Sequence, residues 1–398
     1  MAGPDPSPSP KILLSKSGLV TSKLSYGGSG EEDSTPHRPH LPSVASLNLL
    51  SDSWNFHFDR FLPFLTENTD FTVIGVIGRP GVGKSTIMNE LYGFDSTSHG
   101  MLPPFAIQSE ENRAMAKDCS IGIEPRISSE RIILLDTQPV FSASVLAETI
   151  KPDGSSTIPV MRGESLSAEL AHELMDIQLA VFLASICHIL LVVSEGVLDN
   201  SMWHLMFMIF ADASFCVDLL KHDISDPSLL ASSLSQSSNS GIEKDNKVPE
   251  REYLATPVFI HTKLQGRELS PRIVWLLSKA LMHDFKSSSF VRENTGNNPD
   301  EHSSSKFHNT DMDSNPLKLF AIPFKKKEDN PRVQHESYIS ALWKLRDQIL
   351  SMKPPSFKRP VSEREWLKSS AKIWEQVRNS STISEYGRAL QHSGIYRT

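Results

Sequence analysis

The sequence predicts an α/β fold, in which a mostly parallel β-sheet is covered by helices on both faces. Stretches of continuous apolar and β-branched residues alternate with stretches of helical length and spacing, and this alternation is typical of such folds. A continuous apolar run also indicates a strand that is buried on both sides, as the strands of parallel sheets are. The first of these strands ends at Gly78 and is followed at once by a helical stretch.

The expected strands and helices alternate between residues 71 and 323. Strands are predicted at residues 71–77, 131–136, 186–193, 257–261 and 317–323. Helices are predicted at residues 84–92, 165–184, 200–220 and 271–284. Two further helical segments, residues 337–352 and 362–379, are separated by Lys353, Pro354 and Pro355, a sequence that interrupts a helix.

Three stretches of the chain are too polar to join this fold. Residues 1–45 are dense in Ser, Pro and Gly, and we expect a disordered tail there. Residues 223–249 and 287–315 are expected to be long disordered insertions, because neither can bury enough apolar area to offset its chain entropy. The predicted organisation is therefore a tail, a domain over residues 46–352 and a helical extension over residues 353–398.

The composition argues against several classes of protein. The formal net charge of −7 gives no basic footprint for nucleic acid. The three cysteines, Cys119, Cys187 and Cys216, are too widely spaced for a metal site or a disulfide framework, which fits a reducing compartment. Residues 1–10 lack the pattern of a secretory signal, and the acidic residues within residues 202–220 favour a buried helix over a membrane span. We expect a cytoplasmic protein, with a nuclear location left open.

Residues 78–85 are predicted to bind phosphate. They match the pattern G-x-x-x-x-G-K-[ST] completely, with an apolar strand before them and a helix after them, which is the context that the pattern requires. Glycines let successive backbone N–H groups converge on phosphate oxygens at the helix N-terminus. The residues are Gly78, Arg79, Pro80, Gly81, Val82, Gly83, Lys84 and Ser85. The chain is thus expected to have a P-loop NTPase fold and to bind a purine nucleoside di- or triphosphate.

Four side chains are expected to act on the phosphates and their Mg²⁺ ion. Lys84 reaches the β- and γ-phosphates, while the hydroxyl of Ser85 ligates Mg²⁺. Asp136 ends the strand at residues 131–136, and a carboxylate at that place holds Mg²⁺ through water. Ser120 is the best candidate for a hydroxyl that closes over the ion. For Asp136 the alternative is an ordinary turn-capping role, and for Ser120 it is a plain surface hydroxyl.

The segment after Asp136 departs from that of small GTPases. Those proteins have Asp-x-x-Gly there, and the glycine amide contacts the γ-phosphate, whereas this chain has Pro139, which has no N–H. The next position, which holds the water-positioning Gln in Ras-like proteins, is Val140, whose aliphatic side chain cannot orient a water. Gln138, two residues earlier, could position the water only if the backbone formed a different turn. These departures predict a nucleotide binder with poor or absent hydrolysis.

The residues expected to read the base depart in the same way. The guanine-reading sequence Asn-Lys-x-Asp is expected after the strand near residue 259, where this chain has Thr262, Lys263, Leu264 and Gln265. Lys263 still offers an alkyl stem for stacking, but Gln265 lacks the carboxylate that pairs with guanine. Loss of such a buried partner costs about 1–3 kcal/mol, enough to erode discrimination. Thr262 and Lys263 remain candidate nucleotide-binding residues, with no preference between adenine and guanine.

Three segments together resemble one family. They are residues 71–78, residues 133–139, and Cys187 with His188 near the start of the next strand. They resemble the SMG nine (suppressor with morphogenetic effect on genitalia nine) family of nonsense-mediated mRNA decay factors. The most specific element is the Asp-Thr-Gln-Pro tetrad at residues 136–139, since it replaces a glycine that true GTPases keep.

The resemblance covers about residues 50–350 and implies a fold, partners and a role. Carried over position by position, it extends phosphate binding to Thr86. It implies a G-like domain that pairs with a second G-like subunit, SMG eight. That pair docks on the large phosphatidylinositol-3-kinase-related kinase that phosphorylates the up-frameshift RNA helicase. The implied role is to scaffold and restrain the kinase, with the nucleotide as a structural ligand.

Two apolar helices leave alternatives open. Residues 205–211 form an unbroken apolar run, so this helix is expected to be buried on more than one side, either internally or partly in a subunit interface. Trp366, Leu367 and Trp374 either form an interface or pack back on the domain.

The leading functional hypothesis is a regulatory subunit of a kinase complex that binds a nucleotide and hydrolyses it poorly or not at all. The alternative is an active GTPase or ATPase switch, whose site is completed by Gln138 or by an arginine of a partner. A P-loop kinase of small molecules is disfavoured, because the sequence has no arginine-rich lid segment.

Overall fold

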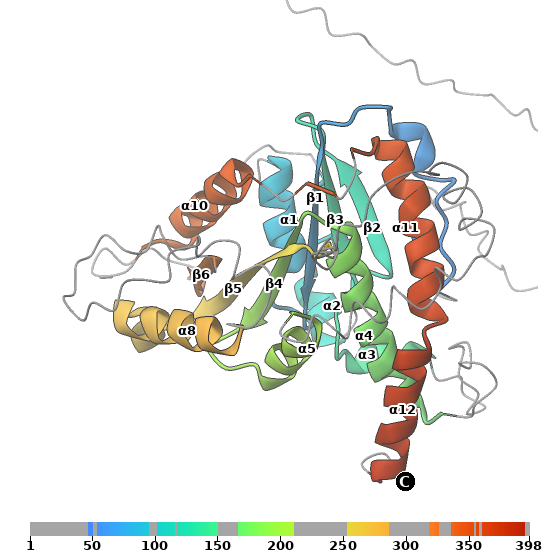
Figure 1. Cartoon of the computed structure of the whole chain (residues 1–398). Helices are drawn as coiled ribbons and strands as arrows, with labels where there is room; N and C mark the ends of the chain where they lie inside the picture. The colour runs from blue at the N-terminus through green and yellow to red at the C-terminus, as the bar shows by residue number, and fades with distance from the viewer. Residues whose placement is uncertain are drawn as a thin grey trace, which may run out of the picture. The chain divides into compact units, whose positions relative to one another are not determined.

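A computed structural model describes a large part of the chain (Figure 1). The described residues are 47–50, 54–94, 102–115, 118–149, 166–210, 253–285, 318–325, 336–353, 356–357 and 360–394. The disorder predicted for residues 1–45, 223–249 and 287–315 lies outside them, as do residues 211–220 of the helix expected at 200–220.

The centre of the fold is a six-stranded sheet with the order β2-β3-β1-β4-β5-β6. All neighbouring strands are parallel except β2 and β3, which are antiparallel. The strands are β1 (Thr72–Gly78), β2 (Ile123–Ile127), β3 (Ile132–Thr137), β4 (Ile189–Glu195), β5 (Thr256–Leu264) and β6 (Lys318–Pro323). The predicted α/β fold with a mostly parallel sheet is therefore confirmed.

Helices cover both faces of this sheet (Figure 1). The long ones are α1 (Lys84–Tyr92), α4 (Ala168–Ile186), α5 (Asn200–Phe210), α8 (Pro271–Asp284), α10 (Tyr338–Ser351), α11 (Glu363–Arg378) and α12 (Ser381–Ser393). The short ones are η1 (Leu62–Phe64), α2 (Glu110–Ala114), α3 (Ala143–Thr149) and η3 (Gly266–Leu269). Among the described residues, no helix has the length and apolarity needed to cross a membrane.

The sheet separates two hydrophobic cores. Alternate residues of β1 point to opposite faces, so Val73 and Ile77 join one core while Ile74 and Val76 join the other. The first core lies under α4, α5 and α11, and the second lies under α1 and α10. Burial on both faces explains why the strands of this sheet read as continuous apolar runs.

One strand was missed, and the start of another was wrong. No strand was predicted at residues 123–127, where Glu124, Pro125 and Arg126 interrupt the apolar pattern; β2 is an edge strand, where proline is tolerated. The strand expected from residue 186 begins at Ile189, since α4 continues through Ile186.

The C-terminal helices pack back on the domain. Trp366 Nε1 donates to the carbonyl of Ile186 at 2.8 Å, and Trp374 Nε1 donates to the carbonyl of Trp54 at 3.0 Å. Both indoles are buried, and Leu367 lies beside them in the first core. Of the two alternatives for this segment, packing on the domain is the one observed.

Candidate functional site

The phosphate loop connects β1 to α1 at the carboxyl end of the sheet, where ligands of open α/β folds bind. Gly81 and Gly83 have φ angles of 71° and 99°, which only glycine adopts without strain. At Gly78 a Cβ atom would lie 2.2 Å from the carbonyl oxygen of Val193 on the neighbouring strand. The loop geometry therefore requires the glycines of the pattern.

Lys84 lies at the first position of α1 and turns its side chain back under the loop. Its Nζ donates to the carbonyls of Gly78 at 3.0 Å and Arg79 at 3.1 Å. Burial lowers the pKa of Lys84 to about 8, although the carboxylates of Asp136 and Asp118 oppose that shift. At neutral pH the ammonium is therefore still mostly charged.

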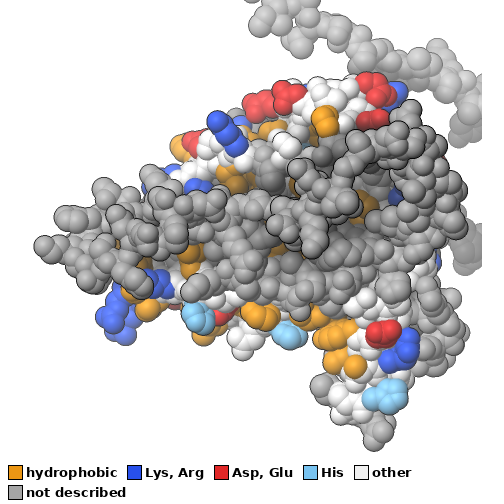
Figure 2. Space-filling view, in the orientation of Figure 1, with side chains coloured by type: hydrophobic (Ala, Val, Ile, Leu, Met, Phe, Trp, Pro, Cys, Tyr) orange, Lys and Arg blue, Asp and Glu red, His pale blue; other side chains and the backbone are white. Residues whose placement is uncertain are grey.

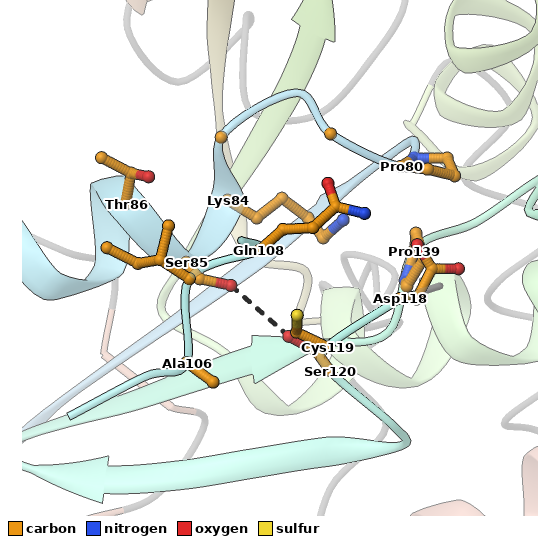
Figure 3. Close-up of a pocket in the computed structure, with 13 residues that line it drawn as sticks. Pro80, Lys84, Ser85, Thr86, Ala106, Gln108, Asp118, Cys119, Ser120 and Pro139 are labelled. Atoms are coloured by element: carbon orange, nitrogen blue, oxygen red, sulfur yellow. Dashed lines mark hydrogen bonds between the residues drawn. The ribbon is translucent and has the colours of Figure 1, made fainter. Parts of the chain in front are cut away.

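The three predicted metal-side residues come together. Ser85 Oγ and Ser120 Oγ each donate to Asp136 Oδ2 at 2.8 Å, and the two hydroxyl oxygens are 3.4 Å apart (Figure 3). Asp136 is fully buried at the end of β3, and this burial raises the pKa of its carboxyl. Its other oxygen, Oδ1, has no hydrogen-bond partner among the described residues.

This arrangement fits a hydrated Mg²⁺ ion. Mg²⁺ prefers oxygen ligands and keeps several of its waters in nucleotide sites. One carboxylate with an unpaired buried oxygen and two adjacent hydroxyls provide such oxygens beside the phosphate loop. When bound, the ion would neutralise phosphate charge, and the residues to hold it are Ser85, Ser120 and Asp136.

A cavity of about 90 Å³ adjoins the loop. It is lined by Pro80, Gly81, Gly83, Lys84, Ser85, Thr86, Ala106, Ile107, Gln108, Asp118, Cys119, Ser120 and Pro139. Six of the predicted phosphate-binding residues are among them, whereas Gly78, Arg79 and Val82 do not line the cavity. The glycine-rich backbone, the ammonium and the adjacent oxygens together fit a polyphosphate group with its metal ion.

The two candidate base-side residues do not line this cavity. Thr262 Oγ1 lies within hydrogen-bond reach of two carbonyls, Val82 at 2.9 Å and Ser194 at 3.2 Å, so this hydroxyl fastens the phosphate loop to the sheet. Lys263 Nζ forms an ion pair with Glu195 at 2.7 Å, and both side chains are partly exposed. Base contact by Thr262 and Lys263 stays a prediction.

The residues at the end of β3 have structural partners. Gln138 Oε1 accepts from the amide of Gly122 at 3.0 Å, and its own backbone amide donates to the Gly122 carbonyl at 2.8 Å. Val140 is buried in the first core, and its amide donates to the Gly78 carbonyl at 3.2 Å. Pro139 lines the cavity with no donor to offer.

Sequence reasoning missed Asp118, Gln108 and Cys119 on the cavity wall. Asp118 accepts from the hydroxyls of Ser142, at 2.5 Å, and of Ser144. The available signal was its position two residues before Ser120, since Asp118, Cys119 and Ser120 form one short segment that lines the cavity together.

Comparison with known proteins gives relatives along most of the chain. No family model matches. Proteins named nonsense-mediated mRNA decay factor SMG9 from Xenopus tropicalis and Xenopus laevis are each 28% identical over 376 residues, which is 87% of this chain and 67% of theirs. The protein of that name from Salmo salar is 27% identical, over 86% of this chain and 67% of its own length. The predicted family resemblance is therefore confirmed.

A solved structure is also similar. It is translation elongation factor SelB from Methanococcus maripaludis in complex with a GTP analogue, at 12% identity and a TM-score of 0.28. The match covers 71% of this chain and 34% of that protein, so the chain spans about a third of it. A TM-score this low does not distinguish one α/β fold from another.

Proposed function

We propose that this chain, a relative of the SMG9 nonsense-mediated mRNA decay factors, is a nucleotide-binding regulatory subunit that does not hydrolyse its nucleotide. Its complex is that of the phosphatidylinositol-3-kinase-related kinase that phosphorylates the up-frameshift helicase, where it pairs with a second G-like subunit, SMG eight. The bound nucleotide is a purine nucleoside di- or triphosphate with Mg²⁺, and its role is structural. The proposed location is the cytoplasm, and the nucleus as well.

The observation that carries the binding half of the proposal is the meeting of the phosphate loop with Asp136. Ser85 comes from the loop and Ser120 from the segment before β2, yet both hydroxyls donate to the same carboxylate oxygen. A buried carboxylate with one unpaired oxygen is costly to keep unless a ligand uses it. A phosphate-bound Mg²⁺ ion accounts for this arrangement.

The non-hydrolysing half rests on Gln138 and its neighbours. Hydrolysis requires a side chain that orients a water beside the terminal phosphate. Gln138 is engaged through both its side-chain oxygen and its backbone with Gly122, and Val140 faces the hydrophobic core. The alternative, an active switch, requires Gln138 to leave these hydrogen bonds or a partner to supply the missing group.

Exposed apolar side chains support a role in a complex. Phe207 on α5 is 48% exposed, and Trp275 and Leu276 on α8 are each 45% exposed. Figure 2 shows apolar side chains along the edge formed by these two helices. Large aromatic residues are enriched at protein interfaces, so this edge is a candidate partner surface, which favours the second of the two alternatives left open for α5.

Purification of the tagged full chain from its own cells tests the proposal. We expect the large kinase and a second G-like protein to co-purify, and denaturation to release a purine nucleotide at close to one per chain. We assign complex formation to the fold and nucleotide retention to the loop. Lys84→Ala should therefore lower the yield of nucleotide more than it lowers the recovery of the partners. Recovery of the chain without any large kinase would contradict the assigned complex.

A further inference from the structure

The loop residues define the direction in which a bound phosphate chain would run through the cavity. In a P-loop the lysine reaches the β- and γ-phosphates, so its ammonium marks the distal end of the phosphate chain. In Figure 3 the Lys84 side chain points away from Thr86 and toward Pro80, Pro139 and Asp118. A third phosphate would therefore extend toward Pro139 and Asp118.

Asp118 is held in place at this distal end. The hydroxyls of Ser142 and Ser144 both donate to its Oδ2 atom, and both follow β3 by only a few residues. The carboxylate also lies close enough to Lys84 to act on it electrostatically. Asp118 is thus a fixed negative charge on the cavity wall rather than a mobile surface group.

We propose that Asp118 and Pro139 make this site select nucleoside diphosphates over triphosphates. The inference rests on the nucleotide binding proposed above and names the ligand class. Pro139 offers no N–H to a terminal phosphate, and the Asp118 carboxylate lines the same cavity. A third phosphate brings additional negative charge to a place that has a like charge and lacks this donor.

The α- and β-phosphates do not meet this obstacle. They lie against the backbone of the loop and the N-terminus of α1, where N–H groups favour anions. Asp118 should therefore lower the affinity for the third phosphate and leave diphosphate binding nearly unchanged. Asp118→Asn is the matching test, because it removes the charge and keeps an oxygen that accepts from the two serines.

The experiment measures dissociation constants of GDP, ADP and the non-hydrolysable triphosphate analogues of both bases, in Mg²⁺, for the full chain. For the wild type we expect diphosphates to bind about tenfold tighter, from one like-charge contact in a partly solvated site. Asp118→Asn should bring the ratio close to one by strengthening triphosphate binding. Asp284→Asn, which removes an exposed charge at the end of α8, should leave the ratio as it is.

Two results separate this inference from the function on which it rests. If the wild type binds no purine nucleotide, both fail. If it binds diphosphate and triphosphate equally, or if Asp118→Asn leaves the ratio unchanged, only the inference fails. Pro139→Gly is a second variant that restores an N–H at the distal end; it too should favour the triphosphate, and no gain there would count against the inference.

Discussion

The Lys84→Ala variant is expected to lose nucleotide binding by roughly 100-fold or more, because truncating one partner of a buried charge pair typically costs about 2–5 kcal/mol. Lys84 is buried, and its Nζ donates to two carbonyls of the loop, from which the proposed site has it contact the phosphates. Isothermal titration calorimetry with GDP and ADP in Mg²⁺ measures the loss.

The fold should tolerate this change. Burial lowers the pKa of Lys84 to about 8 although Asp136 and Asp118 oppose the shift, which means that the fold disfavours the buried ammonium. We therefore expect no large drop in thermal stability for Lys84→Ala. Lys344→Ala, which removes a 66% exposed side chain on α10, is the matched control and should bind as the wild type does. Binding by Lys84→Ala within a few-fold of wild type would contradict the assigned site.

The Trp374→Ala variant is expected to lose about 3–5 kcal/mol of the free energy of unfolding, as truncation of a large buried aromatic does. The Trp374 ring stacks on Trp54 with 5.4 Å between centroids and meets Phe182 edge-on at 5.1 Å. Its Nε1 donates to the Trp54 carbonyl, so the substitution also leaves a buried acceptor unpaired.

Chemical denaturation in urea measures this loss. Trp343 on α10 is 59% exposed, and Trp343→Ala should stay within about 0.5 kcal/mol of the wild type. If Trp374→Ala lost as little free energy of unfolding as Trp343→Ala is expected to lose, α11 would not stabilise the domain. A large effect confined to Trp374 would confirm that the C-terminal segment belongs to the same core as the sheet.

The sequence was sufficient for those parts of the fold whose signal is local. β1, β3 and α1 were predicted closely, because continuous apolar runs and a glycine-rich loop act within a few residues. β2 was missed, since an edge strand needs no apolar run and this one contains Pro125. The packing of Trp366 and Trp374 was left open, because their partners lie roughly two to three hundred residues away along the chain.

Some residues of the candidate site were also predicted from local sequence, while others were not. Ser85 and Asp136 followed from the motif and from a strand end, and the hydroxyl of Ser120 lies with them at the same carboxylate oxygen, while its role at a metal ion stays a prediction. Asp118 was not foreseen, because its hydrogen bonds to Ser142 and Ser144 depend on how two loops meet. The role of Thr262 as an anchor of the loop was also out of reach, since its partner Val82 is 180 residues away.

Two of the residues that carry the family resemblance, Cys187 and His188, have roles in packing. Cys187 lies against Gly75, where a Cβ atom would be 2.6 Å from the Cys187 Sγ atom. His188 Nδ1 accepts from the amide of Val73 at 2.9 Å, and burial lowers the pKa of this imidazole to about 4, so it stays neutral. These two residues join β1 to β4 and have no contact with the phosphate site.

A single-turnover measurement tests the central claim, that the site holds a nucleotide without breaking it. The full chain in excess over γ-labelled GTP or ATP, with Mg²⁺, is followed for released phosphate and for the nucleotide that stays bound. We predict bound nucleotide in the wild type and phosphate release no faster than that of Lys84→Ala. Phosphate release that exceeds this control and disappears on the Lys84 substitution would contradict the account and favour an active switch.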